Sequence, residues 1–116
     1  FGQCASETVA GRYWSGSGGQ ADFARGAMYS DGGQGFIVCR ATAKGGTVSR
    51  IVSRLSPGSV VTTVKNTVDK VVTEYGVAEL RGRSLRKRAV ALINVAHPDF
   101  RDRLTQEARE LGFLRP

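Results

Sequence analysis

Short apolar segments, separated by glycine-rich turns and followed by two amphipathic segments, are the feature that most restricts the fold of this chain. Segments 36–42, 59–64 and 70–76 are rich in Val, Ile and Thr, residues that favour strands. Segment 47–55 alternates its side chains in a pattern that suits a strand or a sheet edge. Short strands followed by helices, with no internal repeat, predict an α/β fold.

The last third of the chain predicts two helices. Ser84 can cap the first, because a serine hydroxyl accepts a hydrogen bond from a free N–H of the first turn. Pro98 suits the first turn of the second helix, His97 is expected to cap it, and Gly112 ends it. The apolar positions of the two segments are Leu85, Ala89, Leu92, Ile93 and Ala96, then Phe100, Leu104, Ala108 and Leu111.

The overall composition predicts one globular domain over residues 1–116. Hydrophobic residues make up 41% and charged residues 23% of the 116 positions, which is typical of a globular domain. No apolar run approaches the length of a membrane span, so no membrane partner is expected. The chain starts at Phe1 and its only methionine is Met28, so we expect it to be a piece of a longer chain.

The two cysteines, Cys4 and Cys39, show neither a CxxC motif nor a zinc spacing. We therefore expect two reduced thiols and no metal site. Reduced thiols indicate a reducing compartment, and the expected location is the cytoplasm.

The net charge of +7 is compatible with nucleic acid, an acidic surface or an anionic small molecule as a partner. The basic residues gather in "RGRSLRKRA" (81–89), which contains no aromatic residue that could stack on a base. The simplest interpretation is the solvated face of a helix. A non-catalytic basic module that binds a nucleotide or nucleic acid remains an alternative function.

A glycine-rich segment, "SGSGGQ" (15–20), precedes a predicted short helix at 21–30. Ordering a glycine costs more conformational entropy than ordering any other residue. Gly16, Gly18 and Gly19 therefore indicate either a structural turn or a place where the backbone must remain bare.

Six blocks in one order resemble the C-terminal domain of the acetyl-CoA hydrolase and 4-hydroxybutyrate CoA-transferase family, a branch of the class I CoA-transferases. They cover nearly the whole chain: "QCASE" (3–7), "SGSGGQADFARGAMYSDGG" (15–33), "SRIV" (49–52), "PGSVVTT" (57–63), "VVTEYGVAELRGRS" (71–84) and "RAVALINVAHPDFRDRL" (88–104). The resemblance implies a mostly parallel sheet flanked by helices, as in NagB/RpiA-like CoA-transferase domains.

The resemblance also implies an activity, the transfer of CoA from an acyl-CoA to a carboxylic acid such as acetate or 4-hydroxybutyrate. A glutamate forms a mixed anhydride and then a glutamyl-CoA thioester, through tetrahedral oxyanions. That glutamate matches no position of this chain, and Glu7 belongs to another block. Acyl-CoA hydrolysis is the alternative reaction. CoA is a substrate here, and no covalently bound cofactor is expected.

The expected partners are an acyl-CoA, a small carboxylate and the rest of the same chain, with a homodimer in the full-length enzyme and no nucleic acid. In the family the glycine loop approaches the thioester and pantetheine arm of CoA. By position, the backbone N–H of Gly19 is the expected oxyanion donor, with Gly18 beside it. A Cβ at Gly19 would block this donor, and a positive φ there could also require glycine.

Four further residues complete the expected site. Ser15, Gly16 and Gln20 would contact the acyl or pantetheine part, and Lys44 would either meet a phosphate or pantetheine oxygen or lie in solvent.

Two carboxylates are expected to support the site. Asp22 would shape the loop by accepting backbone N–H groups. Glu74, at the end of a Val-rich strand, would act through other residues or assist the site of the acceptor carboxylate. Either burial beside Tyr75 shifts its pKa, or its carboxylate binds backbone at the strand end. Local departures from the family pattern at 12–14 ("RYW") and 39–43 ("CRATA") bear on the identity of the acyl substrate.

Overall fold

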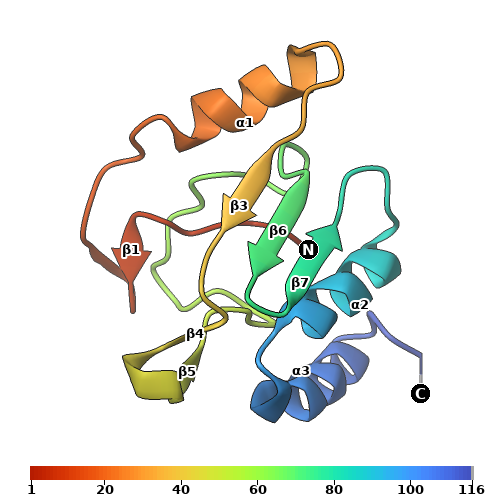
Figure 1. The fold of residues 1–116 in the computed structure, drawn as a ribbon. Coiled ribbons are helices and arrows are strands. Elements are labelled where there is room, and N and C mark those ends of the chain that lie inside the picture. The colour runs from red at the N-terminus through yellow and green to blue at the C-terminus, as the bar shows by residue number, and fades with distance from the viewer. Residues whose placement is uncertain (116) are drawn as a thin grey trace.

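The computed structural model describes residues 1–115, and a three-stranded sheet lies at its centre (Figure 1). The strand order is β3-β6-β7, with β3 at Phe36–Val38, β6 at Lys70–Thr73 and β7 at Gly76–Glu79. The pairing of β3 with β6 is parallel and that of β6 with β7 is antiparallel. The prediction of an α/β domain is thus confirmed, whereas the mostly parallel sheet is not, because the tight turn after β6 reverses the chain.

Two small antiparallel sheets flank the central one. The first joins β1 (Thr8–Val9) to β2 (Arg12–Tyr13), and the second joins β4 (Thr42–Ala43) to β5 (Val48–Ser49). A short 3₁₀ turn, η1 at Lys44–Gly46, connects β4 to β5.

Two predicted strands are largely wrong. Of segment 47–55 only β5 is a strand, and segment 59–64 contains a single bridge, between Thr63 and Cys4. Both ends of the second segment turn sharply, since Ser59 N–H donates to the Ser56 carbonyl and Thr67 N–H donates to the Val64 carbonyl. These turns and the lack of a long partner strand prevent a strand here, although the residues have high strand propensity. The single strand predicted at 70–76 is in fact β6 followed by a turn into β7.

The three helices found within residues 1–115 follow the prediction closely. They are α1 (Gln20–Tyr29), α2 (Leu85–Val95) and α3 (Pro98–Glu110). The Ser84 hydroxyl accepts a hydrogen bond from Lys87 N–H at 3.4 Å, and His97 Nδ1 accepts one from Asp99 N–H at 3.2 Å, so both expected caps are confirmed. Gly112 follows α3 with a positive φ of 74°.

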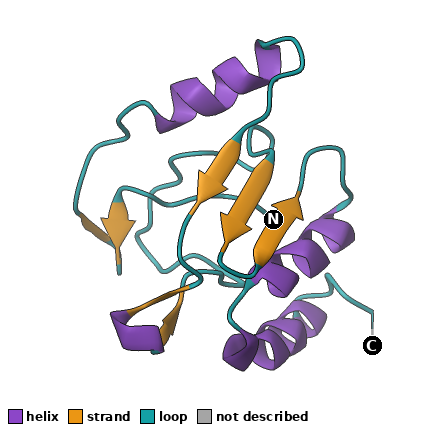
Figure 2. Cartoon of the chain, viewed as in Figure 1, coloured by secondary structure: helices purple, strands orange, loops and turns teal. Residues whose placement is uncertain are grey.

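The core lies between the central sheet and α2, which packs against β6 and β7, while α3 packs against α2 (Figure 2). Its buried members are Val68, Val71, Ala78, Leu80 and Val95. The predicted apolar stripe of α2 is confirmed at Leu92 but not at Leu85, which is 46% exposed. Helix α1 contributes no buried residue and stands apart from the core.

Candidate functional site

The glycine-rich segment forms the loop that enters α1, and Gly19 is the residue at the N-cap. Gly18 has a φ of 54°, in the left-handed region that favours glycine. Gly19 has a φ of −97°, so the expectation of a positive φ at this position is wrong. Instead, a Cβ at Gly19 would come within 3.2 Å of the Phe23 ring, so glycine at this position leaves room for the ring beside the backbone.

The loop is open to solvent at every residue from Ser15 to Gly19. The first N–H groups of a helix have no partner within the helix, and Gly19 has no side chain to cap them. The helix dipole favours negative charge at the same end. The loop therefore offers accessible backbone donors beside the start of α1. Gly16 has no positive φ, and a Cβ added there would have no atom within 4 Å, so nothing in its surroundings requires glycine.

The start of the loop is held by the backbone of Glu7. Its carbonyl accepts hydrogen bonds from the N–H groups of Trp14, at 2.8 Å, and Ser15, at 3.3 Å. The Glu7 carboxylate accepts a hydrogen bond from the Thr62 hydroxyl at 2.9 Å. Glu7 thus ties together three segments of the chain.

Gln20 holds the other end of the loop. Its Nε2 donates to the Thr63 hydroxyl at 3.2 Å, which ties α1 to the segment that bridges Cys4. The family resemblance implies a substrate contact for this amide. In the structure its nitrogen supports the fold, and its oxygen is the part left for a ligand.

A groove of about 730 Å³ lies between α1 and the amino ends of β3 and β6. Its walls are mainly apolar, and the lining includes Gln20, Asp22, Phe23, Ala27, Ile37 and Val68. Asp22 lies in the first turn of α1 and is exposed, and among the hydrogen bonds of residues 1–115 none goes to its carboxylate. The expected role of Asp22 as an acceptor for loop N–H groups is therefore not seen.

Glu74 lies in the turn at the carboxyl end of β6. Its Oε2 accepts a hydrogen bond from Ala41 N–H at 2.8 Å, which fastens the segment between β3 and β4. Hydrogen bonds from its own backbone N–H and from that of Ala41 lower the pKa of the Glu74 carboxyl. The expected burial is wrong, because Glu74 is exposed, whereas the alternative expectation, that its carboxylate binds backbone at the strand end, is confirmed. This geometry suits a positioning residue and does not suit a general acid.

Lys44 is exposed in η1, between β4 and β5, and has a φ of 49°. Its carbonyl accepts hydrogen bonds from the N–H and hydroxyl of Thr47. Lys44 and Glu74 belong to the end of the sheet opposite α1 (Figure 1), and neither lines the groove beneath that helix. Gln20 and Asp22 thus line the same groove, whereas Lys44 and Glu74 lie outside it.

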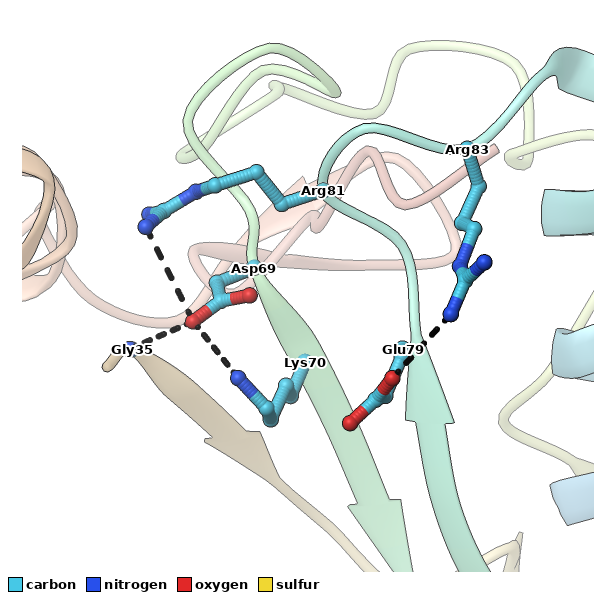
Figure 3. Close-up of polar contacts among 6 residues, drawn as sticks. All are labelled: Gly35, Asp69, Lys70, Glu79, Arg81 and Arg83. Carbon is cyan, nitrogen blue, oxygen red and sulfur yellow. Dashed lines mark hydrogen bonds and ion pairs between the residues drawn. The ribbon is translucent and has the colours of Figure 1, made fainter.

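A charged cluster at the amino ends of β3 and β6 was not predicted from the sequence (Figure 3). Asp69 is 7% exposed and accepts hydrogen bonds from Gly35 N–H at 3.1 Å and Lys70 Nζ at 3.0 Å, with Arg81 Nη1 at 3.8 Å. Burial alone would raise the pKa of Asp69, but the bonds from Lys70 and Gly35 and the charge of Arg81 outweigh it and lower the pKa. The adjacent charges in "TVDKVV" (67–72), at the start of a Val-rich strand, were the available signal.

Most arginines of the basic segment 81–89 serve the fold. Arg88 donates to the carbonyl groups of Phe1 and Lys65, and Arg83 pairs with Glu79 at 3.4 Å. Arg81 faces Asp69. Arg86 and Lys87 are exposed, so the structural use of this segment rests on Arg88 and, through one nitrogen, on Arg81.

Both cysteines are free thiols in this structure. Burial raises the pKa of the Cys39 thiol, and the proximity of Cys4 adds to the shift. Within residues 1–115 no cluster of His, Cys, Asp or Glu has the makings of a metal site. None of the helices described here has the length and apolar character needed to cross a membrane.

Comparison with known proteins gives matches over nearly the entire chain. The family model for the acetyl-CoA hydrolase/transferase C-terminal domain matches residues 1–108. A succinyl-CoA:cyclohexane-1-carboxylate CoA transferase of Geobacter metallireducens is 60% identical over 97% of this chain and 26% of its own length. A 4-hydroxybutyrate coenzyme A transferase of Clostridium kluyveri is 53% identical over 95% of this chain and 26% of its own length. Other relatives include an acetyl-CoA hydrolase of Kluyveromyces lactis.

A solved structure supports the same assignment. RipA from Yersinia pestis superposes with a TM-score of 0.88 and 46% identity, over 97% of this chain and 25% of that one. The chain thus spans about a quarter of the length of the relatives it matches. Sequence and fold agree, and the chain belongs to the acetyl-CoA hydrolase/transferase family, in which it corresponds to the C-terminal domain.

Proposed function

We propose that this domain is part of an enzyme that transfers CoA from an acyl-CoA to a small carboxylic acid through a glutamyl-CoA thioester. The glutamate belongs to another part of the protein, and this domain supplies the oxyanion donors. The names of the relatives support the reaction class, since they include transferases that act on succinyl-CoA and 4-hydroxybutyrate.

The observation that carries this proposal is the bare backbone at Gly18 and Gly19. These residues are exposed, lack side chains and lie at the positive end of α1. An acyl group placed above them would accept backbone hydrogen bonds as its carbonyl becomes a tetrahedral oxyanion. Such donors act mainly on the transition state, because the charge on the oxygen develops there.

Hydrolysis of an acyl-CoA requires the same donors, with water in place of the acceptor acid. Because an acetyl-CoA hydrolase stands among the relatives, the test must separate the two reactions. In both, the mixed anhydride and then the glutamyl-CoA thioester would form on the same glutamate outside this domain.

The experiment is to incubate the full-length protein with an acyl-CoA and to locate any covalently attached CoA by peptide mass spectrometry. We expect one labelled glutamate, outside residues 1–116, and transfer of the CoA to added carboxylate. The 116-residue domain alone should show no turnover. A labelled residue within this domain, or robust turnover by the domain alone, would refute the proposal. Release of free CoA at the same rate with and without an acceptor acid would identify a hydrolase.

A further inference from the structure

A buried threonine holds the residue that follows the glycine-rich loop. Gln20 is the first residue of α1, and its Nε2 donates to the Thr63 hydroxyl at 3.2 Å. Thr63 is only 1% exposed, so its hydroxyl is closed to any substrate. Within residues 1–115 this is the one hydrogen bond of the Thr63 side chain. The anchor thus lies one residue away from Gly19, the proposed oxyanion donor.

Thr63 is itself fixed by its backbone. Its carbonyl accepts from Cys4 N–H at 3.0 Å, and its N–H donates to the Cys4 carbonyl at 3.2 Å. The hydroxyl of the neighbouring Thr62 donates to the Glu7 carboxylate at 2.9 Å, and the Glu7 carbonyl holds the start of the loop. Both ends of the loop are therefore attached to two threonines that are adjacent in sequence.

Apolar packing does little to fix the position of α1. The helix has no buried residue, the Phe23 ring is 82% exposed, and the groove separates α1 from β3 and β6. Figure 1 shows the helix apart from the central sheet and from the other helices. The segment after its far end is tied separately, since Gly35 N–H donates to the Asp69 carboxylate at 3.1 Å. The polar contacts at its two ends thus determine where its first turn points.

We propose that Thr63 is a positioning residue for CoA transfer, which acts through Gln20 to hold the backbone donors of the glycine-rich loop in the orientation that the oxyanion requires. The inference rests on the proposed function, because that function gives these donors their role. An oxyanion donor acts over about 2.7–3.1 Å, so a small rotation of the first turn is enough to lose it. A misplacement of about 1 Å can lower a rate by about 10²-fold.

Thr63→Val removes the acceptor and keeps the shape of the side chain. With acetyl-CoA and 4-hydroxybutyrate as substrates of the full-length protein, we expect kcat to fall at least about tenfold. KM should change little, because Thr63 does not contact CoA. Thr63→Ser keeps the hydroxyl and should restore kcat. Thr105→Val is the matched control, since it removes a hydroxyl that bonds to the Arg101 carbonyl within α3, and it should transfer CoA like the wild type.

Amide hydrogen exchange gives a measurement that does not depend on activity. Phe23 N–H donates to the Gly19 carbonyl at 2.9 Å and reports on the first turn of α1, whereas Ser30 N–H donates to the Gly26 carbonyl at 2.9 Å and reports on the last. In Thr63→Val we expect the Phe23 amide to exchange roughly tenfold faster and the Ser30 amide to be unchanged. An unchanged Phe23 amide, or equal acceleration at both amides, would overturn the proposal.

Combining Thr63→Val with Gly19→Ala separates this inference from the proposed function. If Thr63 acts through the Gly19 donor, the double variant should be no slower than Gly19→Ala alone, whereas additive losses would show that Thr63 affects the rate by another route. A wild-type kcat in Thr63→Val beside a slow Gly19→Ala would overturn the positioning role and leave the proposed function intact. A wild-type kcat in Gly19→Ala would overturn both.

Discussion

The Glu74 carboxylate and the Ala41 backbone N–H form a 2.8 Å hydrogen bond that spans 33 residues of sequence. The bond joins the β6–β7 turn to the segment between β3 and β4. The pKa of the Glu74 carboxyl is lowered by this hydrogen bond and by one from its own backbone N–H. The group is ionised at neutral pH, and a charged acceptor makes the hydrogen bond stronger.

Replacing Glu74 should therefore loosen this segment without unfolding the domain. In Glu74→Ala we expect the Ala41 amide to exchange roughly tenfold faster or more, because its acceptor is lost. Glu74→Gln keeps an acceptor oxygen, so its Ala41 amide should exchange at a rate between those of Glu74→Ala and the wild type. Hydrogen exchange with single-residue resolution is the measurement. An Ala41 amide that is equally protected in all three proteins would show that the bond does not hold the segment.

Asp69 predicts a specific dependence of stability on pH. Its pKa in the folded state is lowered, so it contributes stability above its unfolded pKa of about 3.9, and that contribution is lost as pH falls through the folded value. Asp69→Asn should destabilise the protein by about 1–3 kcal/mol at pH 7, and the difference from wild type should shrink below about pH 4.

Urea unfolding at several pH values measures this difference. Asp102→Asn is the matched control, because Asp102 is exposed on α3, and it should change stability little at any pH. A difference between Asp69→Asn and wild type that stays constant down to about pH 2 would contradict the assigned role.

Thr73 joins the end of β6 to the end of α2. Its buried hydroxyl donates to the Val95 carbonyl at 2.6 Å and accepts from Tyr75 N–H at 3.1 Å. Thr73→Val keeps the shape but leaves both partners unpaired, so we expect a loss of about 1–3 kcal/mol in the free energy of unfolding. Thr47→Val, which removes an exposed hydroxyl from η1, should cost less than about 0.5 kcal/mol. Chemical denaturation measures the free energy of unfolding of both variants. Equal values for the two would contradict a stabilising role of the Thr73 hydroxyl.

The helices could be predicted because their signals are local. Ser84, His97 and Gly112 act within one turn of their own helix, so sequence spacing alone determines what they do. The strands depend on partners that are distant in sequence. Segment 59–64 has the composition of a strand, yet its available partner is Cys4, and the result is one bridge.

The candidate site shows the same division. The loop at 15–19 and its helix could be recognised from glycine spacing, although the positive φ expected at Gly19 was wrong. The closeness of Gly19 to the Phe23 ring could not be foreseen, because it appears only once the helix turns. The bond from Ala41 to Glu74 and the contact of Asp69 with Arg81 depend on tertiary structure. No sequence spacing encodes either pair.

The central claim is that Gly19 N–H stabilises an oxyanion, and Gly19→Ala tests it most cleanly. A Cβ at Gly19 would stand beside its N–H and hinder the approach of the oxygen that this donor serves. The φ of −97° is accessible to alanine, and the Phe23 ring that the Cβ would meet is exposed and can move, so the domain should still fold. Gly18→Ala is less suitable, because the positive φ of Gly18 would add backbone strain. Gly16→Ala is the matched control, since nothing lies within 4 Å of its added methyl group.

The deciding measurement is the steady-state kinetics of CoA transfer by the full-length Gly19→Ala and Gly16→Ala proteins, with thermal melts to verify folding. A donor that acts mainly in the transition state predicts that kcat and kcat/KM of Gly19→Ala fall together, by about 10²–10³-fold. Gly16→Ala should stay close to wild type. A Gly19→Ala protein that keeps the wild-type kcat while KM rises would show that the loop only holds CoA, and it would contradict the oxyanion role.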